Sequence, residues 1–100
     1  MNKKEEYTEK QIQIANFAKA MSHPARVFIL QKLSKLNACC YSGDLIDDLP
    51  ISRSALSLHL KELKNAGLIQ GHTEAPYIKY CINRENWKIA KMLCKEMFEE

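Results

Sequence analysis

Two groups of residues in this 100-residue chain have the types and spacing to do chemistry: a polar stretch at 52–65 and four cysteines. The polar stretch combines small hydroxyl side chains with basic ones on one side of an expected helix. Small hydroxyl side chains let a backbone come close to a DNA groove, arginine can make a bidentate contact to guanine, and lysine suits phosphates. The candidate DNA contacts in this stretch are Arg53, Ser54, Ser57, Leu58, Lys61 and Lys64.

The leucines of the same stretch predict which way the helix faces. Leu56, Leu60 and Leu63 recur at i, i+4 and i+7, so they form one apolar stripe that packs inward. His59 lies beside this stripe, and two interpretations of it stay open: a half-buried hydrogen-bonding residue or a direct DNA contact. His23 is interpreted as part of a helix-capping region.

Apolar periodicity and capping residues place the elements around this helix. With their caps included, the predicted helices lie at 8–21, 22–36, 42–49, 52–67 and 83–97. After residue 67 the apolar period changes from 3.6 to 2, which predicts strands at 68–70 and 77–82 joined by a tip at 71–76. The capping residues expected are Thr8 with Gln11, then Ser22, Ser42, Ser52 and Asn83, with Gly67 as a left-handed helix end.

This order of elements predicts a winged helix-turn-helix. A short helix, a tight turn at 50–52, a second helix and a β-hairpin make that motif, in which the second helix enters a major groove. The expected fold class is mostly helical with a small β-hairpin (α+β), in a single domain over residues 1–100. His72 at the hairpin tip and Lys79 on its second strand are further candidate DNA contacts, although His72 is equally well explained as an idle loop residue.

Composition and charge limit the function. Fifteen Lys and Arg against 12 Asp and Glu give a net charge of +3, which permits nucleic-acid binding without requiring it. The sequence predicts neither a transmembrane helix nor a secretory signal, so we expect a cytoplasmic protein with no membrane partner. It has no glycine-rich phosphate loop and no His-Glu-x-x-His motif, so we expect neither an enzyme nor a cofactor. A winged helix that binds another protein is the competing interpretation.

Several runs of residues also carry a family resemblance. They lie at residues 20–26, 29–30, 44–49, 52–63 and 66–69. The run at 52–63 contains a Ser-x-His-Leu element at 57–60. Together they resemble the ArsR/SmtB family of winged helix-turn-helix regulators over about residues 14–87. The resemblance implies a homodimeric transcriptional repressor that binds double-stranded DNA and leaves its operator when an inducer binds. A regulator that binds DNA independently of any inducer is the alternative.

The resemblance further implies that the first and last helices build the dimer interface. The apolar residues of those helices agree with this, because one small core would leave many of them exposed, and monomers rarely tolerate a large apolar patch. The residues expected at this interface are Ile14, Phe17, Trp87, Leu93 and Met97.

The family's known metal sites are not reproduced here. One of them resembles a Cys-x-Cys-Asp/Glu-Leu run, but Tyr41 and Gly43 occupy the two cysteine positions before Asp44. The other places His and Asp or Glu along the last helix, where residues 84–100 contain no His and no Asp. A tight zinc or nickel site is therefore not predicted, and whether any metal binds stays unknown.

The cysteines allow three interpretations, and we expect them as free thiols at rest in a reducing compartment. The run at 40–45 resembles the Cys-x-x-Gly-Glu-Leu run of the family's dithiol redox and persulfide sensors, whose partner in the last helix would be Cys94. Alternatively, Cys39 and Cys94 are small buried hydrophobic residues. In the third interpretation, three thiolates capture a soft ion such as arsenite in a trigonal site that includes Cys39 or Cys40 and a third thiol.

The sensing hypothesis assigns DNA release to Cys40, with Cys94 as partner and Cys39 as substitute. Cys40 precedes a helix N-terminus, where the helix dipole lowers the pKa of a thiol and favours the thiolate. A link from there to the last helix would connect the helix-turn-helix to the expected dimer interface.

Overall fold

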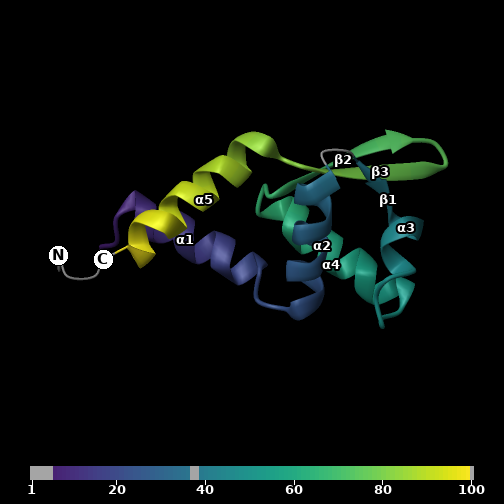
Figure 1. Ribbon diagram of the computed structural model, residues 1–100, viewed down its shortest axis with the longest axis horizontal. Coiled ribbons are helices and arrows are strands. Elements are labelled where there is room, and N and C mark those ends of the chain that lie inside the picture. The colour runs from purple at the N-terminus through teal and green to yellow at the C-terminus, as the bar shows by residue number, and fades with distance from the viewer. Residues whose placement is uncertain (1–5, 37–38, 100) are drawn as a thin grey trace.

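The computed structural model describes residues 6–36 and 39–99 and is elongated, with extents of 50 × 26 × 25 Å. Two terminal helices lie side by side at one end, and the remaining helices with the sheet form the other end (Figure 1). The elements are α1 (Glu9–Ala20), α2 (Pro24–Leu36), β1 (Cys40–Tyr41), α3 (Ser42–Ile46), α4 (Arg53–Asn65), β2 (Ile69–Glu74), β3 (Tyr77–Ile82) and α5 (Arg84–Phe98). Among the described residues, no helix is both long enough and apolar enough to cross a bilayer.

Three of the predicted helix caps are confirmed. The backbone N–H of Gln11 donates to the Thr8 hydroxyl while the Gln11 side chain accepts from the Thr8 backbone, so the capping box is complete. The Ser52 hydroxyl accepts from the backbone N–H three residues later at 3.1 Å. The Asn83 side-chain oxygen accepts in the same way from the backbone N–H of Asn86 at 3.1 Å. These caps satisfy backbone donors that a helix leaves free in its first turn.

Two predicted caps are wrong. At the start of α2 the backbone N–H of Ala25 donates to Nδ1 of His23 at 3.0 Å, so His23 takes the capping role that we expected of Ser22. The Ser22 hydroxyl instead donates back to the Lys19 carbonyl at 2.7 Å. Ser42 lies inside α3, whose N-cap is Tyr41 without a side-chain bond, because β1 continues up to the helix.

The core confirms the predicted inward face of α4. Leu56, Leu60 and Leu63 are each at most 3% exposed, and they join one apolar cluster with Ile29 and Leu33 of α2. Burying a leucine side chain contributes roughly 1.5–3 kcal/mol, so this stripe fixes how α4 is rotated against the other helices.

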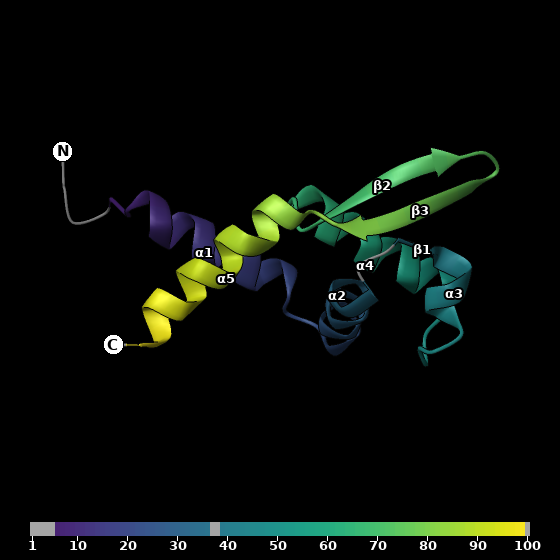
Figure 2. The same ribbon diagram turned by 45° about the horizontal axis from the view of Figure 1, so that its top comes forward.

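The wing differs from the predicted hairpin in two respects. It is a three-stranded antiparallel sheet in the order β1-β3-β2 (Figure 2). The extra strand β1 has only two residues, too few for any alternation to be visible in the sequence. The hairpin strands also extend further, so the turn is reduced to 75–76 and His72 lies inside β2, paired with Lys79.

Helices α1 and α5 pack against each other through residues that we had expected at a dimer interface. Phe17 of α1 is 7% exposed and Leu93 of α5 is 3% exposed, so the single chain already buries both. Ile14 and Trp87 are half-buried, and Met97 is 44% exposed. The expectation that all five side chains need a partner chain is therefore wrong for Phe17 and Leu93.

The end of α4 is a tight left-handed turn, as predicted. Gly67 has φ +80°, its N–H donates to the Lys64 carbonyl at 2.9 Å, and the next N–H, of Leu68, reaches the Leu63 carbonyl at 3.1 Å. This bonding pattern is a Schellman motif. The Asn86 side chain donates to the Gly67 carbonyl at 2.9 Å, which fastens the start of α5 to the same turn.

We predict that Gly67→Ala lowers the free energy of unfolding by about 1–2 kcal/mol, because a left-handed backbone is strained for a residue with a Cβ. The added Cβ would also lie 2.8 Å from the Asn86 amide nitrogen. Gly43→Ala is the matched control, since its Cβ would meet nothing within 4 Å. Urea unfolding of the three proteins measures the difference, and equal midpoints for Gly67→Ala and the parent would contradict the strain argument.

Candidate nucleic-acid interface

The outer face of α4 presents the side chains that the sequence predicted there. The Ser52 cap makes Arg53 the first residue of the helix. All six candidate contacts are exposed, and Leu58 has 64% of its surface accessible. Among the described residues, Arg53 and Lys61 have no ion-pair partner, so their charges face solvent. The six exposed candidates are Arg53, Ser54, Ser57, Leu58, Lys61 and Lys64.

His59 is half-buried and fastens α4 to the start of α2. The Arg26 guanidinium donates from Nε to Nδ1 of His59 at 3.0 Å and from Nη1 to the Ala20 carbonyl at 3.4 Å. The ring of His23 lies 4.4 Å from that of His59, centroid to centroid. Burial lowers the pKa of His59, and the charges of His23 and Arg26 lower it further. The neutral ring is thus favoured, which the hydrogen bond to Nδ1 also requires.

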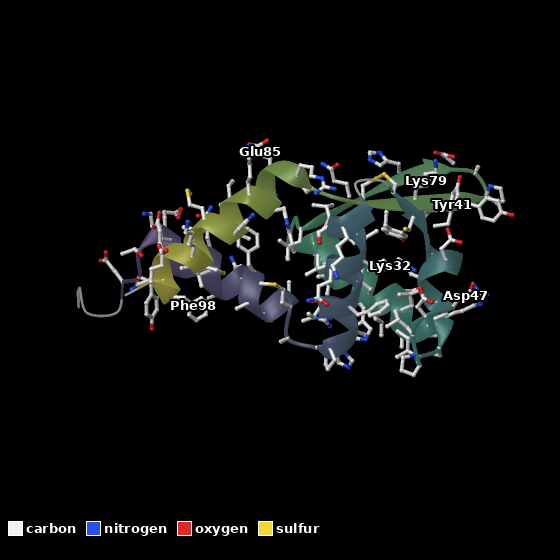
Figure 3. All side chains as sticks on the ribbon, viewed as in Figure 1. Lys32, Tyr41, Asp47, Lys79, Glu85 and Phe98 are labelled. Atoms are coloured by element: carbon white, nitrogen blue, oxygen red, sulfur yellow. A yellow bond between two sulfur atoms is a disulfide. The ribbon has the colours of Figure 1, made fainter. Side chains whose placement is uncertain are left out.

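Lys79 is engaged within the wing. Its Nζ lies 3.3 Å from a Glu74 carboxylate oxygen and 5.3 Å from the centre of the Tyr41 ring (Figure 3). The Tyr41 hydroxyl donates to the same carboxylate at 3.0 Å. The bond to Glu74 raises the pKa of Lys79, while the Tyr41 and Lys79 bonds lower the pKa of Glu74. The positive charge of Lys79 is therefore partly compensated, whereas His72 is exposed on the neighbouring strand.

A second polar link holds α3, the first helix of the helix-turn-helix. The Lys32 ammonium of α2 donates to the Asp48 carboxylate and to the Asp44 carbonyl, the latter at 3.4 Å. The bond to Asp48 raises the pKa of Lys32. No sequence pattern indicated this link or the hydrogen bond between Tyr41 and Glu74, because each connects residues from different elements.

The cysteines depart furthest from expectation. Cys39 and Cys81 form a disulfide, with their Cα atoms 4.4 Å apart, so the expectation of four free thiols at rest is wrong for this pair. Cys40 is only 7% exposed, and burial raises its pKa. The predicted thiolate at Cys40 is therefore also wrong, because the loss of solvent disfavours the charged form.

Within one chain the structure does not bring Cys40 and Cys94 together. Cys40 belongs to β1 in the wing, whereas α5 runs away from the sheet toward the opposite end of the molecule (Figures 1 and 2). Cys94 is half-buried in α5 and lines an open apolar hollow with Met21, Trp87 and Ala90. In the part of the chain that the structure describes, no group of three or more His, Cys, Asp or Glu residues could hold a metal ion. The three-thiol arsenite site is therefore not formed by these residues.

Comparisons with known proteins agree with this geometry. Residues 23–70 match the family described as bacterial regulatory protein, arsR family. The HTH-type transcriptional regulator YgaV of Escherichia coli (strain K12) is 40% identical over 73 residues, which are 73% of each chain. The transcriptional repressor SdpR of Bacillus subtilis (strain 168) is 35% identical over 68% of this chain and 73% of its own length.

A solved structure supports the same assignment. The ArsR-like transcriptional regulator from Rhodococcus sp. RHA1 superposes with a TM-score of 0.71 at 28% identity, over 92% of this chain and 86% of its own. The predicted family and the winged helix-turn-helix fold are thus both confirmed. The chain belongs to the ArsR family of DNA-binding helix-turn-helix transcriptional regulators, which are not enzymes.

Proposed function

We propose that this ArsR-family regulator is a homodimeric, cytoplasmic repressor that reads its operator with the exposed face of α4 and leaves it when an inducer acts. The observation that carries the proposal is the composition of that face. A helix that is buried on one side presents arginine, small hydroxyl residues and lysines together on the other side, next to a wing.

The arrangement along α4 suits a major groove. Arg53 stands at the N-terminal end, where the recognition helix of a helix-turn-helix meets base edges. Ser54 and Ser57 are small enough for the backbone to come close, and Leu58 can contact a thymine methyl group. Lys61 and Lys64, nearer the C-terminal end, suit phosphates. His72 and Lys79 are secondary contacts from the wing, and Lys79 must give up part of its interaction with Glu74 to serve.

We predict that Arg53→Ala weakens operator binding by about 1–3 kcal/mol and relaxes discrimination at one base pair, as the loss of a bidentate guanine contact would. Fluorescence anisotropy on the operator and on single-base variants measures both effects. Lys19→Ala, an exposed lysine in the last turn of α1, is the matched control. If Arg53→Ala retains the affinity of the parent, α4 is docked differently.

Lys64→Ala should behave differently from Arg53→Ala. A phosphate contact carries no sequence information, so its loss weakens all duplexes alike and lowers the salt dependence of binding by about one unit. Titrations at several salt concentrations, on operator and on random duplex, measure this slope. If Lys64→Ala weakened binding to the operator alone, Lys64 would contact a base and not a phosphate.

The terminal helices support the dimer. Large apolar side chains on or beside α1 and α5 stay exposed in the single chain, and at the far end of α5 Phe98 projects from the molecule (Figure 3). A contiguous exposed apolar surface is typical of a protein interface. The exposed residues are Tyr7 at 73%, Ile12 at 45%, Met92 at 51%, Met97 at 44% and Phe98 at 79%.

We predict that the chain sediments as a dimer at micromolar concentration and that Met92→Asp with Phe98→Asp converts it to a monomer, because charges would be buried at the interface. Its operator should contain two half-sites roughly 34 Å apart. Leu58→Asp is the control for an added charge and should leave the dimer intact in the absence of DNA, since Leu58 is also apolar and exposed but lies on α4. A monomer in the parent, alone and on DNA, contradicts the proposal.

We further propose that His59 is a positioning residue and not a base contact. Its Nδ1 accepts the Arg26 hydrogen bond, so the ring holds α4 against the α1–α2 corner. Protonation would remove that acceptor and place a second positive charge beside Arg26. The hydrogen bond thus depends on a neutral ring.

We predict a stability loss in acid that depends on His59. Its pKa is lower in the folded chain than in the unfolded chain, so its contribution is present above about pH 6.5 and is lost as the pH falls through the folded-state pKa. His59→Asn keeps an acceptor without titrating, so its free energy of unfolding should vary less between pH 7 and 5. The exposed His72→Asn is the control and should follow the parent. Parallel pH profiles for all three proteins would exclude this role.

A further inference from the structure

We propose that Cys39 and Cys81 are a site of reversible oxidation that fastens the wing sheet to the first helix of the helix-turn-helix. Their Cα atoms are 4.4 Å apart, within the range that a disulfide accepts. The strand register explains this distance: Cys40 pairs with Tyr80, so the residue before Cys40 faces the residue after Tyr80. A cross-strand pair at about 4.5 Å is the closely spaced kind in an antiparallel ladder.

Solvent exposure and position distinguish Cys39 and Cys81 from the other two cysteines as the pair that is oxidised. Cys39 is exposed and Cys81 is half-buried, so small oxidants and reductants reach both. Successive side chains of a strand point to opposite faces, which turns Cys40 into the core. Burial raises the pKa of Cys40 and so suppresses the thiolate that reacts. Cys94 lies on α5, outside the sheet.

This step rests on the proposed function, which places the protein in the cytoplasm. There the Cys39–Cys81 pair has a reduced state and an oxidised state. Cytoplasmic thiols are kept reduced, and disulfides that do form there are usually transient and redox-sensing. The disulfide is then the oxidised state of a couple and not a permanent crosslink.

The reaction needs a two-electron oxidant, for which hydrogen peroxide serves. The Cys39 thiolate attacks one peroxide oxygen, the O–O bond breaks, the leaving hydroxide takes up a proton, and Cys39 becomes a sulfenic acid. The Cys81 thiolate then attacks that sulfur, the S–O bond breaks, and the leaving hydroxide takes up a proton to become water. Two thiols have lost two electrons and two protons, and peroxide has become two waters. Dithiothreitol reverses the change by thiol–disulfide exchange and ends as its own cyclic disulfide.

Oxidation of Cys39 and Cys81 affects the DNA-binding motif because strand β1, which follows Cys39, leads directly into α3. Strand β1 pairs with β3 over two residues only, and α3 begins at the next residue, Ser42. The disulfide therefore strengthens a weak attachment and closes a segment, 39–81, that contains α3, α4 and β2. Oxidation limits how far α3 and α4 move relative to the wing. A surface held in its binding arrangement loses less entropy on binding, so we infer that the oxidised form binds DNA more tightly.

The first experiment locates the disulfide. The full chain is equilibrated in glutathione buffers of increasing oxidised fraction, alkylated, digested without reductant and analysed by mass spectrometry. We expect one crosslinked species, which joins the peptides of Cys39 and Cys81 and is absent from Cys39→Ser and Cys81→Ser. No crosslink in the most oxidising buffer, or a main product that contains Cys40 or Cys94, overturns the proposal.

The second experiment tests the coupling, with a duplex selected from random sequences by the dithiothreitol-reduced protein. We expect peroxide-oxidised parent to bind this duplex about five-fold or more tightly than reduced parent, a typical size for coupling between two sites. Backbone hydrogen exchange at Cys40 and Tyr41 should slow on oxidation. Cys39→Ser and Cys81→Ser should match the reduced parent under both conditions, and Cys94→Ser should respond as the parent does.

The outcomes separate the redox proposal from the proposed function. Equal affinity and equal exchange in the two redox states overturn the coupling, although the protein still binds DNA. If neither state selects any duplex, the proposed operator reading fails, while the crosslink analysis still decides whether Cys39 and Cys81 are a redox couple.

Discussion

Burial of one face of α4 is the constraint on which the rest of the structure depends. Leu56, Leu60 and Leu63 are almost completely removed from water, and α4 packs on α2, α3 and β2 at once. With 3.6 residues per turn, a helix whose apolar stripe is fixed has its opposite face fixed as well. The hydroxyl and basic side chains are therefore presented together, in one orientation, beside the wing.

Helix α2 supplies the polar links that keep this arrangement in place. Arg26 at its start binds His59 of α4, and Lys32 further along binds Asp48 beyond α3. Both helices of the helix-turn-helix are thus attached to the same scaffold by apolar packing and by a charged side chain. Arg26 and Lys32 therefore stabilise the fold, and Lys79 interacts with Glu74 within the wing. The exposed Arg53 and the lysines of α4 stay available for DNA.

The two features that we propose to affect DNA binding lie in different parts of the molecule. Helices α1 and α5, which carry the exposed apolar surface, lie at one end of the molecule, and the sheet lies at the other (Figure 1). The Cys39–Cys81 pair joins the residue before β1 to β3 in that sheet. Pairing of two chains through the terminal helices would set the spacing of two α4 helices. The disulfide would set the position of α3 and α4 against the wing within one chain.

The sequence by itself determined the features that depend on residues a few positions apart. The caps at Thr8, Ser52 and Asn83, the left-handed Gly67 and the inward stripe of α4 are all confirmed, because each follows from the spacing of residues within one helix or at its ends. These local features, together with the resemblance, were enough to predict a winged helix-turn-helix of the ArsR family and the exposed face of α4. The DNA contacts themselves stay predictions.

Only the tertiary structure decided the features that join distant residues. Strand β1 exists because β3 lies beside it, and the Cys39–Cys81 pair spans 42 positions. The Arg26–His59 bond spans 33 positions. Cys40 shows the difference most clearly: its place before a helix suggested a thiolate, but the fold turns it into the core, where loss of solvent raises its pKa. Solvation and cross-strand neighbours are properties of the packed chain, and no local pattern encodes them.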